Sequence, residues 1–137
     1  MSEENRQVLD VDVLFVGAGS ASLAGALHLK KLSVNAGLDI SIAIIEKARE
    51  IGAHSLSGAI IDPRSLNELI PDHIEKGVPF EAEVAEENMY YLSSKGKFRF
   101  PYLPKSMSHH GCYVASLGKF TRWMGKICEN EGLDIFC

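Results

Sequence analysis

Cysteine, clustered basic residues and long apolar stretches are all scarce in this sequence, and each scarcity excludes a class of protein. The three cysteines, Cys112, Cys128 and Cys137, are too widely spaced for a disulfide framework or a Cys-x-x-Cys metal or redox site, so we expect reduced thiols. The formal net charge is −4 and lysines and arginines form no run, which argues against a nucleic-acid partner. No apolar stretch approaches the roughly 18 residues that a membrane-spanning helix needs.

The overall composition is that of a globular protein. The chain has 137 residues, of which 46% are hydrophobic and 23% charged, enough for one domain of ordinary size with its own core. Its first residues are polar and acidic, unlike a signal or transit peptide, so we expect this segment to start in the cytoplasm. Residues 1–10 are expected to be frayed, and residues 11–137 are expected to form the domain.

Residues 11–46 organise the chain. Residues 13–16 form a continuous apolar run, which is typical of a parallel strand buried on both faces. Gly17 and Gly19 follow it, a helical run comes next, and a second apolar run ends in Glu46. This order of strand, glycine turn, helix, strand and acid predicts a βαβ unit that holds a dinucleotide, with the helix starting within about two residues of Ser20.

The glycines and the acid suit particular parts of a dinucleotide. Gly17 allows the tight turn out of the strand, and Gly19, which has no Cβ, lets the backbone approach a pyrophosphate. The N–H groups and the dipole at the start of the helix favour the same negative charge. Glu46 can accept hydrogen bonds from ribose hydroxyls, and it repels a 2′-phosphate, which disfavours NADP.

Two departures weaken this fingerprint. Ser22 stands where the third glycine of G-x-G-x-x-G is usual, so we expect the helix to approach the strand slightly less closely. Glu46 lies 27 positions after Gly19 rather than about 20, and a longer helix or loop within residues 32–39 absorbs the difference. The alternative interpretation is a glycine turn in an ordinary βαβ unit.

The stretch after Glu46 lacks the pattern of a helix or a strand. Residues 52–59 are small or hydroxyl-bearing, with glycine at positions 52 and 58. Their backbone N–H and C=O groups need partners, and a cofactor lying across the loop would supply them. A plain linking loop is the alternative.

The remainder of the chain is predicted to form short helices and strands. Residues 62–70 predict a short helix, with Asp62 as its cap and Pro63 at its first position. The other expected elements are a loop (76–83), a hairpin (88–92 and 97–100), a strand (112–115), a helix (117–130) and a strand (133–136).

Together these elements predict an α/β fold. The strands near Val13, Ile42, Val114 and Ile135 are expected to form a parallel, Rossmann-like sheet, with the hairpin as an antiparallel layer. We expect this domain to be incomplete at its C-terminal end. His109 and His110 are interpreted as loop histidines and no metal site is predicted, because adjacent residues point apart and no Cys, Asp or Glu lies at ligand spacing in that loop.

Beyond the fingerprint, Glu46-Lys47 followed by residues 51–59 (Ile-Gly-Ala-His-Ser-Leu-Ser-Gly-Ala) and Asp62-Pro63 resembles the N-terminal part of the electron transfer flavoprotein–ubiquinone oxidoreductase family. The likeness spans residues 12–136. It implies an FAD-containing enzyme, peripheral on the inner or cytoplasmic membrane, that passes electrons from reduced electron transfer flavoprotein through a [4Fe–4S] cluster to ubiquinone. Cofactors would carry that chemistry, so we nominate no catalytic side chain.

The same resemblance assigns an FAD site. Family members usually have proline and glycine at the positions of Ser20 and Ser22. The residues implied are Gly17, Ala18, Gly19, Ser20, Ala21 and Ser22 at the pyrophosphate, Glu46 with Lys47 at the adenosine ribose, and Ala53, His54, Ser55, Leu56, Ser57 and Gly58 towards the isoalloxazine.

A [4Fe–4S] cluster needs four cysteine thiolates, and this chain has three. We therefore expect the cluster ligands, the quinone site and the membrane-associated surface beyond Cys137, and we interpret the chain as an N-terminal fragment that is inactive alone. Two alternatives are a fragment of another FAD oxidoreductase, such as a geranylgeranyl reductase, and a non-catalytic dinucleotide-binding fragment.

Overall fold

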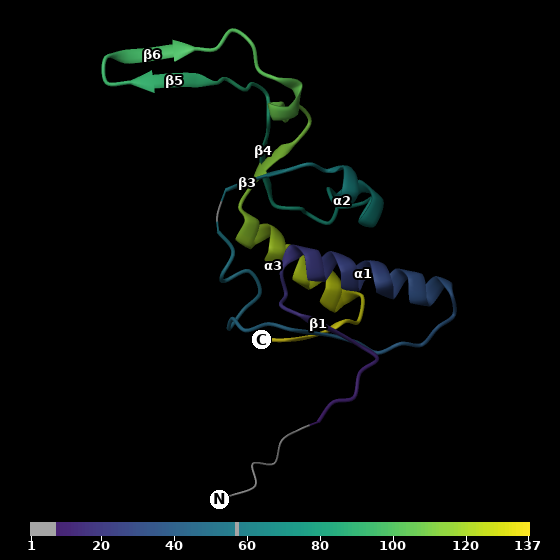
Figure 1. The fold of residues 1–137 in the computed structure, drawn as a ribbon. Coiled ribbons are helices and arrows are strands. Elements are labelled where there is room, and N and C mark those ends of the chain that lie inside the picture. The colour runs from purple at the N-terminus through teal and green to yellow at the C-terminus, as the bar shows by residue number, and fades with distance from the viewer. Residues whose placement is uncertain (1–7, 57) are drawn as a thin grey trace, which may run out of the picture. The chain divides into compact units, whose positions relative to one another are not determined.

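The structure is a computed structural model that describes residues 8–56 and 58–137, in two compact units (Figure 1). The first unit comprises residues up to 55 and residues 121–137, and the second comprises residues 56–120. Of the N-terminus expected to be frayed, residues 1–7 lie outside the described part, and residues 8–10 belong to no helix or strand.

Short strands and three α-helices make up the described chain. In order they are β1 (Val13–Val16), α1 (Ser20–Asn35), β2 (Ile42–Ile45), β3 (Ala59–Ile61), α2 (Arg64–Leu69), β4 (Phe80–Glu83), β5 (Tyr90–Ser93), β6 (Gly96–Arg99), a 3₁₀ turn (Lys105–Met107), β7 (Tyr113–Ala115), α3 (Leu117–Asn130) and β8 (Asp134–Phe136).

The first unit contains the predicted βαβ unit. Its parallel sheet has the order β1-β2-β8, with Val13 opposite Ile42 and Ile44 opposite Ile135. Helix α1 begins at Ser20, where the sequence predicted it. Helices α1 and α3 lie on the same side of this sheet (Figure 1), and the Sγ of Cys128 in α3 approaches the Leu23 carbonyl in α1 at 3.5 Å. The predicted Rossmann-like α/β fold class is confirmed.

Two glycines allow close packing inside this unit. A Cβ on Gly25 of α1 would lie 3.2 Å from the Phe15 ring of β1, and a Cβ on Gly125 of α3 would lie 2.5 Å from the Cδ1 of Ile51. Real Cβ atoms rarely approach a neighbour so closely, so a larger residue at either position would require the Phe15 ring or the Ile51 side chain to shift. Helix α1 therefore approaches the strand at Gly25, one turn beyond Ser22.

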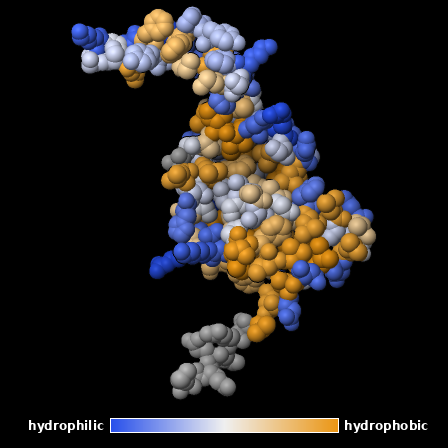
Figure 2. Space-filling model, viewed as in Figure 1, coloured by the Kyte–Doolittle hydropathy of each residue, from blue (hydrophilic) through white to orange (hydrophobic). Residues whose placement is uncertain are grey.

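The other face of the sheet is open among the described residues. Leu14 and Val16 are 50% and 75% exposed, because successive strand residues point to opposite faces and both helices lie on one side. Leu14 joins Leu9 and Phe136 in an apolar groove of about 360 Å³, and Figure 2 shows apolar surface over this part of the chain. The expectation that β1 is buried on both faces is therefore wrong for this structure.

The second unit holds a separate antiparallel sheet. Strand β7 pairs with β3 on one side and β4 on the other. Two predictions are corrected here: the strand near Val114 does not belong to the parallel sheet, and residues 76–83 are not all loop, since β4 covers Phe80–Glu83. Strand β3 was not predicted, because three apolar residues after a glycine are too short a pattern to identify a strand.

Aromatic contacts form the core of this sheet. The Phe80 ring stacks on Tyr113 at 4.3 Å between centroids, and the ring of buried His73 meets Phe80 edge-on at 6.0 Å. The predicted short helix is α2, at whose start the Asp62 carboxylate accepts the Arg64 N–H at 3.0 Å. The His109 N–H and ring both pair with the Glu87 carboxylate, which holds the pKa of Glu87 below its usual value.

The predicted hairpin is present. Strands β5 and β6 pair only with each other, from Tyr90 opposite Arg99 to Ser93 opposite Gly96. Among the residues that the structure describes, no helix has the length and apolar character needed to cross a membrane.

The burial of Cys128 generates a first prediction. Its side chain is fully buried, and burial raises the pKa of its thiol to about 12, whereas Cys137 is exposed. Thiolate is the reactive form, so Cys128 should resist alkylation in the native chain and react only after unfolding. Peptide mapping after brief treatment with iodoacetamide, with and without guanidinium, would measure this. Modification of Cys128 at the rate of Cys137 in the native state would show that α3 does not pack as described.

Candidate functional site

The glycine turn between β1 and α1 forms the centre of the candidate site. Gly17 has φ +94°, a conformation that residues with a Cβ rarely adopt, and its N–H extends the parallel pairing by donating to the Ile45 carbonyl at 2.7 Å. A Cβ built on either Gly17 or Gly19 would find no atom within 4 Å. Packing therefore does not require glycine at position 19, and the open space beside it can admit a ligand.

The start of α1 is suited to a negative charge. Gly19 is the N-cap residue, in extended conformation, and no side chain caps the helix there. The first turn contains no acidic residue, and the Leu23 N–H is bonded to the Gly19 carbonyl. The N–H groups of Ser20, Ala21 and Ser22 precede that bond and point out of the helix end, where the macrodipole is positive.

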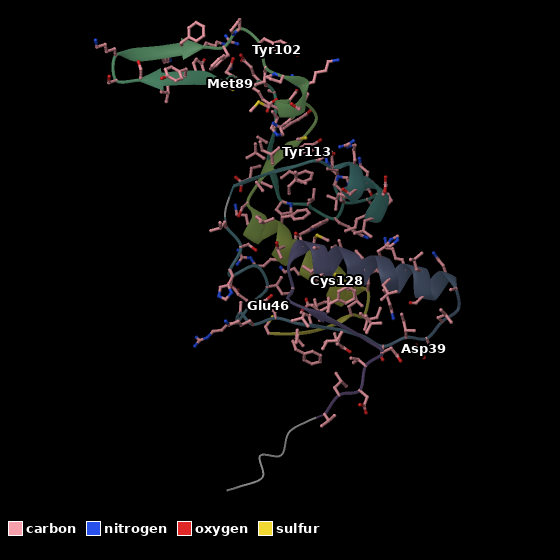
Figure 3. The ribbon with its side chains drawn as sticks, viewed as in Figure 1. Asp39, Glu46, Met89, Tyr102, Tyr113 and Cys128 are labelled. Atoms are coloured by element: carbon pink, nitrogen blue, oxygen red, sulfur yellow. The ribbon has the colours of Figure 1, made fainter. Side chains whose placement is uncertain are left out.

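Glu46, which follows the end of β2, stabilises the glycine turn through hydrogen bonds. Its Oε2 accepts the Ala18 N–H at 2.7 Å and its Oε1 accepts the Ala48 N–H at 2.8 Å. Its own N–H donates to the Phe136 carbonyl at 2.7 Å. The N–H groups of Ala48 and Ala18 hold the pKa of Glu46 below its usual value, and the charge of His54 adds to this. The carboxylate, labelled in Figure 3, is therefore ionised at neutral pH.

Glu46 and the glycine turn share one crevice. It measures about 270 Å³ and is lined by Val16, Gly17, Ile45, Glu46 and Lys47. It lies at the carboxyl ends of β1 and β2, where open α/β sheets bind ligands. A hydroxyl-bearing group beside the carboxylate would fit the chemistry of this crevice, and an anion would suit the start of α1, which follows the same turn.

The structure brings some predicted site residues together and leaves others apart. Gly17 to Ser22, Glu46 and Lys47 surround the turn, although Ala18 is buried and can offer only its backbone. Ala53 and His54 are exposed and Ser55 is partly buried in the first unit. Leu56 and Gly58 belong to the second unit, and Ser57 lies outside the described residues. Binding roles for all of these residues stay predictions.

The loop after Glu46 satisfies part of its backbone without any ligand. The Ala53 N–H donates to the Glu50 carbonyl at 3.3 Å, and the Ser55 N–H donates to the Gly52 carbonyl at 3.2 Å. These local turns explain how small residues can form an ordered loop here. At these two positions the backbone therefore does not need a cofactor as a hydrogen-bond partner, which was the expectation for residues 52–59.

Sequence reasoning missed two features of the site. Gly25 was not singled out, although a glycine within a predicted helix that packs on a strand is a sign of close approach. The contact between the Ala18 N–H and Glu46 was also missed, because the fingerprint gives spacing and no hydrogen-bond partners. Within the described residues, no three His, Cys, Asp or Glu side chains gather as a metal site would require.

Comparison with known proteins extends this description. No family model matches the chain. It is 44% identical to a mitochondrial electron transfer flavoprotein–ubiquinone oxidoreductase of Dictyostelium discoideum over 91% of its length, 42% identical to the human protein over 93%, and 41% identical to that of Pseudomonas aeruginosa over 96%. It covers only 20%, 21% and 24% of those proteins, so it spans about a fifth to a quarter of their length.

Solved structures share the fold at low identity. A geranylgeranyl bacteriochlorophyll reductase-like protein of Thermoplasma acidophilum matches 91% of the chain with a TM-score of 0.60 at 20% identity, and the chain covers 29% of it. CtdE in complex with FAD and a substrate matches 93% with a TM-score of 0.62, also at 20% identity, and the chain covers 30% of it. These likenesses show the fold alone.

The sequence relatives are the more informative comparison, because their identity is twice that of the structural neighbours and extends over nine-tenths of the chain. The resemblance seen in residues 51–59 and in the glycine turn is confirmed. By sequence, the chain is similar over nine-tenths of its length to a portion of the electron transfer flavoprotein–ubiquinone oxidoreductases, which are oxidoreductases.

Proposed function

We propose that the chain is FAD-binding and supplies the pyrophosphate and adenosine side of the site in a protein of this family. The observation that carries the proposal is the glycine turn held by Glu46 against an α1 end without acidic residues or a side-chain cap. The carboxylate acceptor lines one crevice with Gly17, and the positive end of α1 begins just after the same turn. A pyrophosphate next to a ribose presents the complementary groups.

In this proposal the chain binds and orients the cofactor. The N–H groups of Ser20, Ala21 and Ser22 would receive the pyrophosphate, and Glu46 would receive the ribose hydroxyls. Each Glu46 oxygen accepts one backbone N–H and has a further lone pair available, so it need not release the turn to bind a ribose. Bound FAD would supply the electron-accepting chemistry, which requires no acid or base from the protein. Residues 53–58 are proposed to lie towards the isoalloxazine.

The complete reaction is a proposal for a whole protein of the family. There, electrons would pass from reduced electron transfer flavoprotein to ubiquinone through a [4Fe–4S] cluster, at the face of the inner or cytoplasmic membrane. The relatives' names support the donor and the acceptor. The three cysteines of this chain are widely spaced in the sequence and Cys128 is fully buried, so a cluster would need ligands from elsewhere.

A geranylgeranyl reductase-like function is the alternative, because such a protein shares the fold at a TM-score of 0.60. Sequence identity of 20% to that protein, against 41–44% to the flavoprotein–ubiquinone oxidoreductases, favours the first proposal. Both candidate functions require FAD. Equilibrium dialysis of the pure chain against FAD and against ADP would measure whether it binds them.

Substitutions at Gly19, the N-cap residue of α1, can distinguish an effect on ligand binding from an effect on folding. Gly19→Asp should cap α1 and keep or raise stability by about 0.5 kcal/mol, yet it places a carboxylate where the pyrophosphate would lie. Gly19→Asn caps equally well and has nearly the same shape without the charge. We expect FAD or ADP to bind the Asp variant at least about tenfold more weakly than the Asn variant, a difference of about 1.4 kcal/mol. If both variants bind with equal affinity in dialysis and unfold at the same temperature, the pyrophosphate does not bind at this turn.

Glu46 should select an unphosphorylated ribose. We expect the native chain to bind ADP more tightly than 2′-phospho-ADP, and Glu46→Gln to reduce that preference because the repelling charge is gone. The pKa of Glu46 is lowered, so its charge, and with it the preference, is retained at neutral pH and is lost only as the pH falls through that lowered value, below about 4.5. Competition dialysis at several pH values measures this. A preference that is the same in both chains would contradict the role.

The chain by itself should hold little FAD and reduce no quinone. It spans about a fifth of its relatives, and one apolar face of the β1-β2-β8 sheet is open. The contacts named here cover the pyrophosphate and ribose, and each missing hydrogen bond weakens binding by about 1 kcal/mol. Visible absorbance of the purified chain after gel filtration would show the bound flavin. A stoichiometric flavin spectrum on a monomeric peak would contradict the expectation.

A further inference from the structure

Helix α3 contacts a tight turn formed by residues 50–53. The Ala53 N–H donates to the Glu50 carbonyl at 3.3 Å, which closes the turn, and Gly52 at its third position has φ +78°. A β-turn with a positive φ at this position favours glycine there. Glu50 and Ile51 therefore occupy the first two positions of a turn whose shape is set by its own backbone.

Both of these residues contact α3. A Cβ on Gly125 would lie 2.5 Å from the Cδ1 of Ile51 and 3.4 Å from its Cγ2, so Ile51 occupies the space that a larger residue in α3 would need. Three residues earlier in the helix, the Arg122 guanidinium donates to the Glu50 carboxylate at 3.2 Å. Residues three apart lie on the same side of a helix, so one side of α3 contacts two consecutive residues of the turn. The ion pair is largely exposed and adds little, so the apolar contact dominates.

The segment that leads into this turn begins at the candidate site. The buried Ala48 donates its N–H to the Oε1 of Glu46 at 2.8 Å. Only Arg49 separates Ala48 from Glu50, so a shift of the turn is transmitted to this hydrogen bond across a single residue. The Ala48 N–H is the main cause that lowers the pKa of Glu46, and the charge of His54, which follows the turn directly, also lowers it. The position of the turn therefore affects the carboxylate.

We propose that α3 is a positioning element of the dinucleotide site, in which the space at Gly125 accommodates Ile51 and so fixes the segment that holds Glu46. Neither Gly125 nor Ile51 lines the crevice, so both are positioning residues that act through Glu46. The Sγ of Cys128, labelled on α3 in Figure 3, approaches the Leu23 carbonyl of α1 at 3.5 Å. The same helix therefore also contacts the helix whose start would receive the pyrophosphate.

An exchange of side-chain size tests this contact. Gly125→Val places a branched side chain in the space of Ile51 and should displace the turn, although valine forms helices no less well than glycine. Adding Ile51→Ala restores the fit, because the two new side chains together have as many carbon atoms as the isoleucine, and volume-conserving exchanges are tolerated best. Carbon NMR of the Glu46 carboxyl group in the ligand-free chain measures its pKa. We expect this pKa to rise in Gly125→Val, as the Ala48 N–H and the charge of His54 move away, and to return in the double variant.

Binding should change in parallel. Gly125→Val should bind ADP about fivefold more weakly than the native chain in equilibrium dialysis, and the double variant should recover the native affinity. Lys126→Val introduces the same side chain at the neighbouring exposed position and should alter neither the affinity nor the pKa of Glu46. Resistance of Cys128 to alkylation confirms that each variant is folded.

The binding half of this proposal rests on the proposed function, whereas the pKa of Glu46 is measured without a ligand. If the native chain binds no ADP, the proposed function fails and the pKa alone decides whether α3 positions Glu46. An unchanged pKa in folded Gly125→Val, or a rise that Ile51→Ala does not reverse, would overturn the positioning role. If Gly125→Val does not fold, Ile51→Ala alone empties the same space without adding atoms. It should also raise the pKa, and an unchanged value would overturn the role.

Discussion

The carboxylate of Glu46 holds together segments that are far apart in the sequence. Its two oxygens accept N–H groups from the glycine turn and from the chain after β2, while its backbone N–H bonds to the end of β8. An amide side chain could accept only at its single oxygen, so it would leave one of the two N–H groups without this partner. The shape of the turn therefore depends on an ionised acid.

The sheet next to this acid is covered from one side. Parallel sheets normally have both faces covered, but α1 and α3 lie together here, and Leu14 and Val16 point away from them. The chain spans about a fifth of its relatives' length. Among the described residues, no helix covers this second face of the sheet. The exposed apolar area of this face favours self-association of the chain. Binding measurements therefore need the aggregation state of the chain to be determined as well.

The sequence predicted those parts whose pattern is local. The apolar runs of β1 and β2, the glycines between them and the acid at the end gave the βαβ unit, and α3 was predicted over the residues it occupies. Strand β7 was predicted as a strand but assigned to the wrong sheet, because three residues do not reveal their partners. The site followed the same rule: the motif identified Gly17, Gly19 and Glu46, while Gly25 and the Ala18 N–H became visible only through contacts made in space.

The glycine turn and the β5–β6 hairpin differ in the source of their order. The glycine turn is fixed by hydrogen bonds inside the protein, so a dinucleotide would meet a preformed site and lose little free energy in ordering it. The hairpin has only its own cross-strand pairs, with every strand residue exposed, so it has little intrinsic stability. The hairpin is therefore held only by its own pairing among the described residues, whereas the turn is also held by the carboxylate of Glu46.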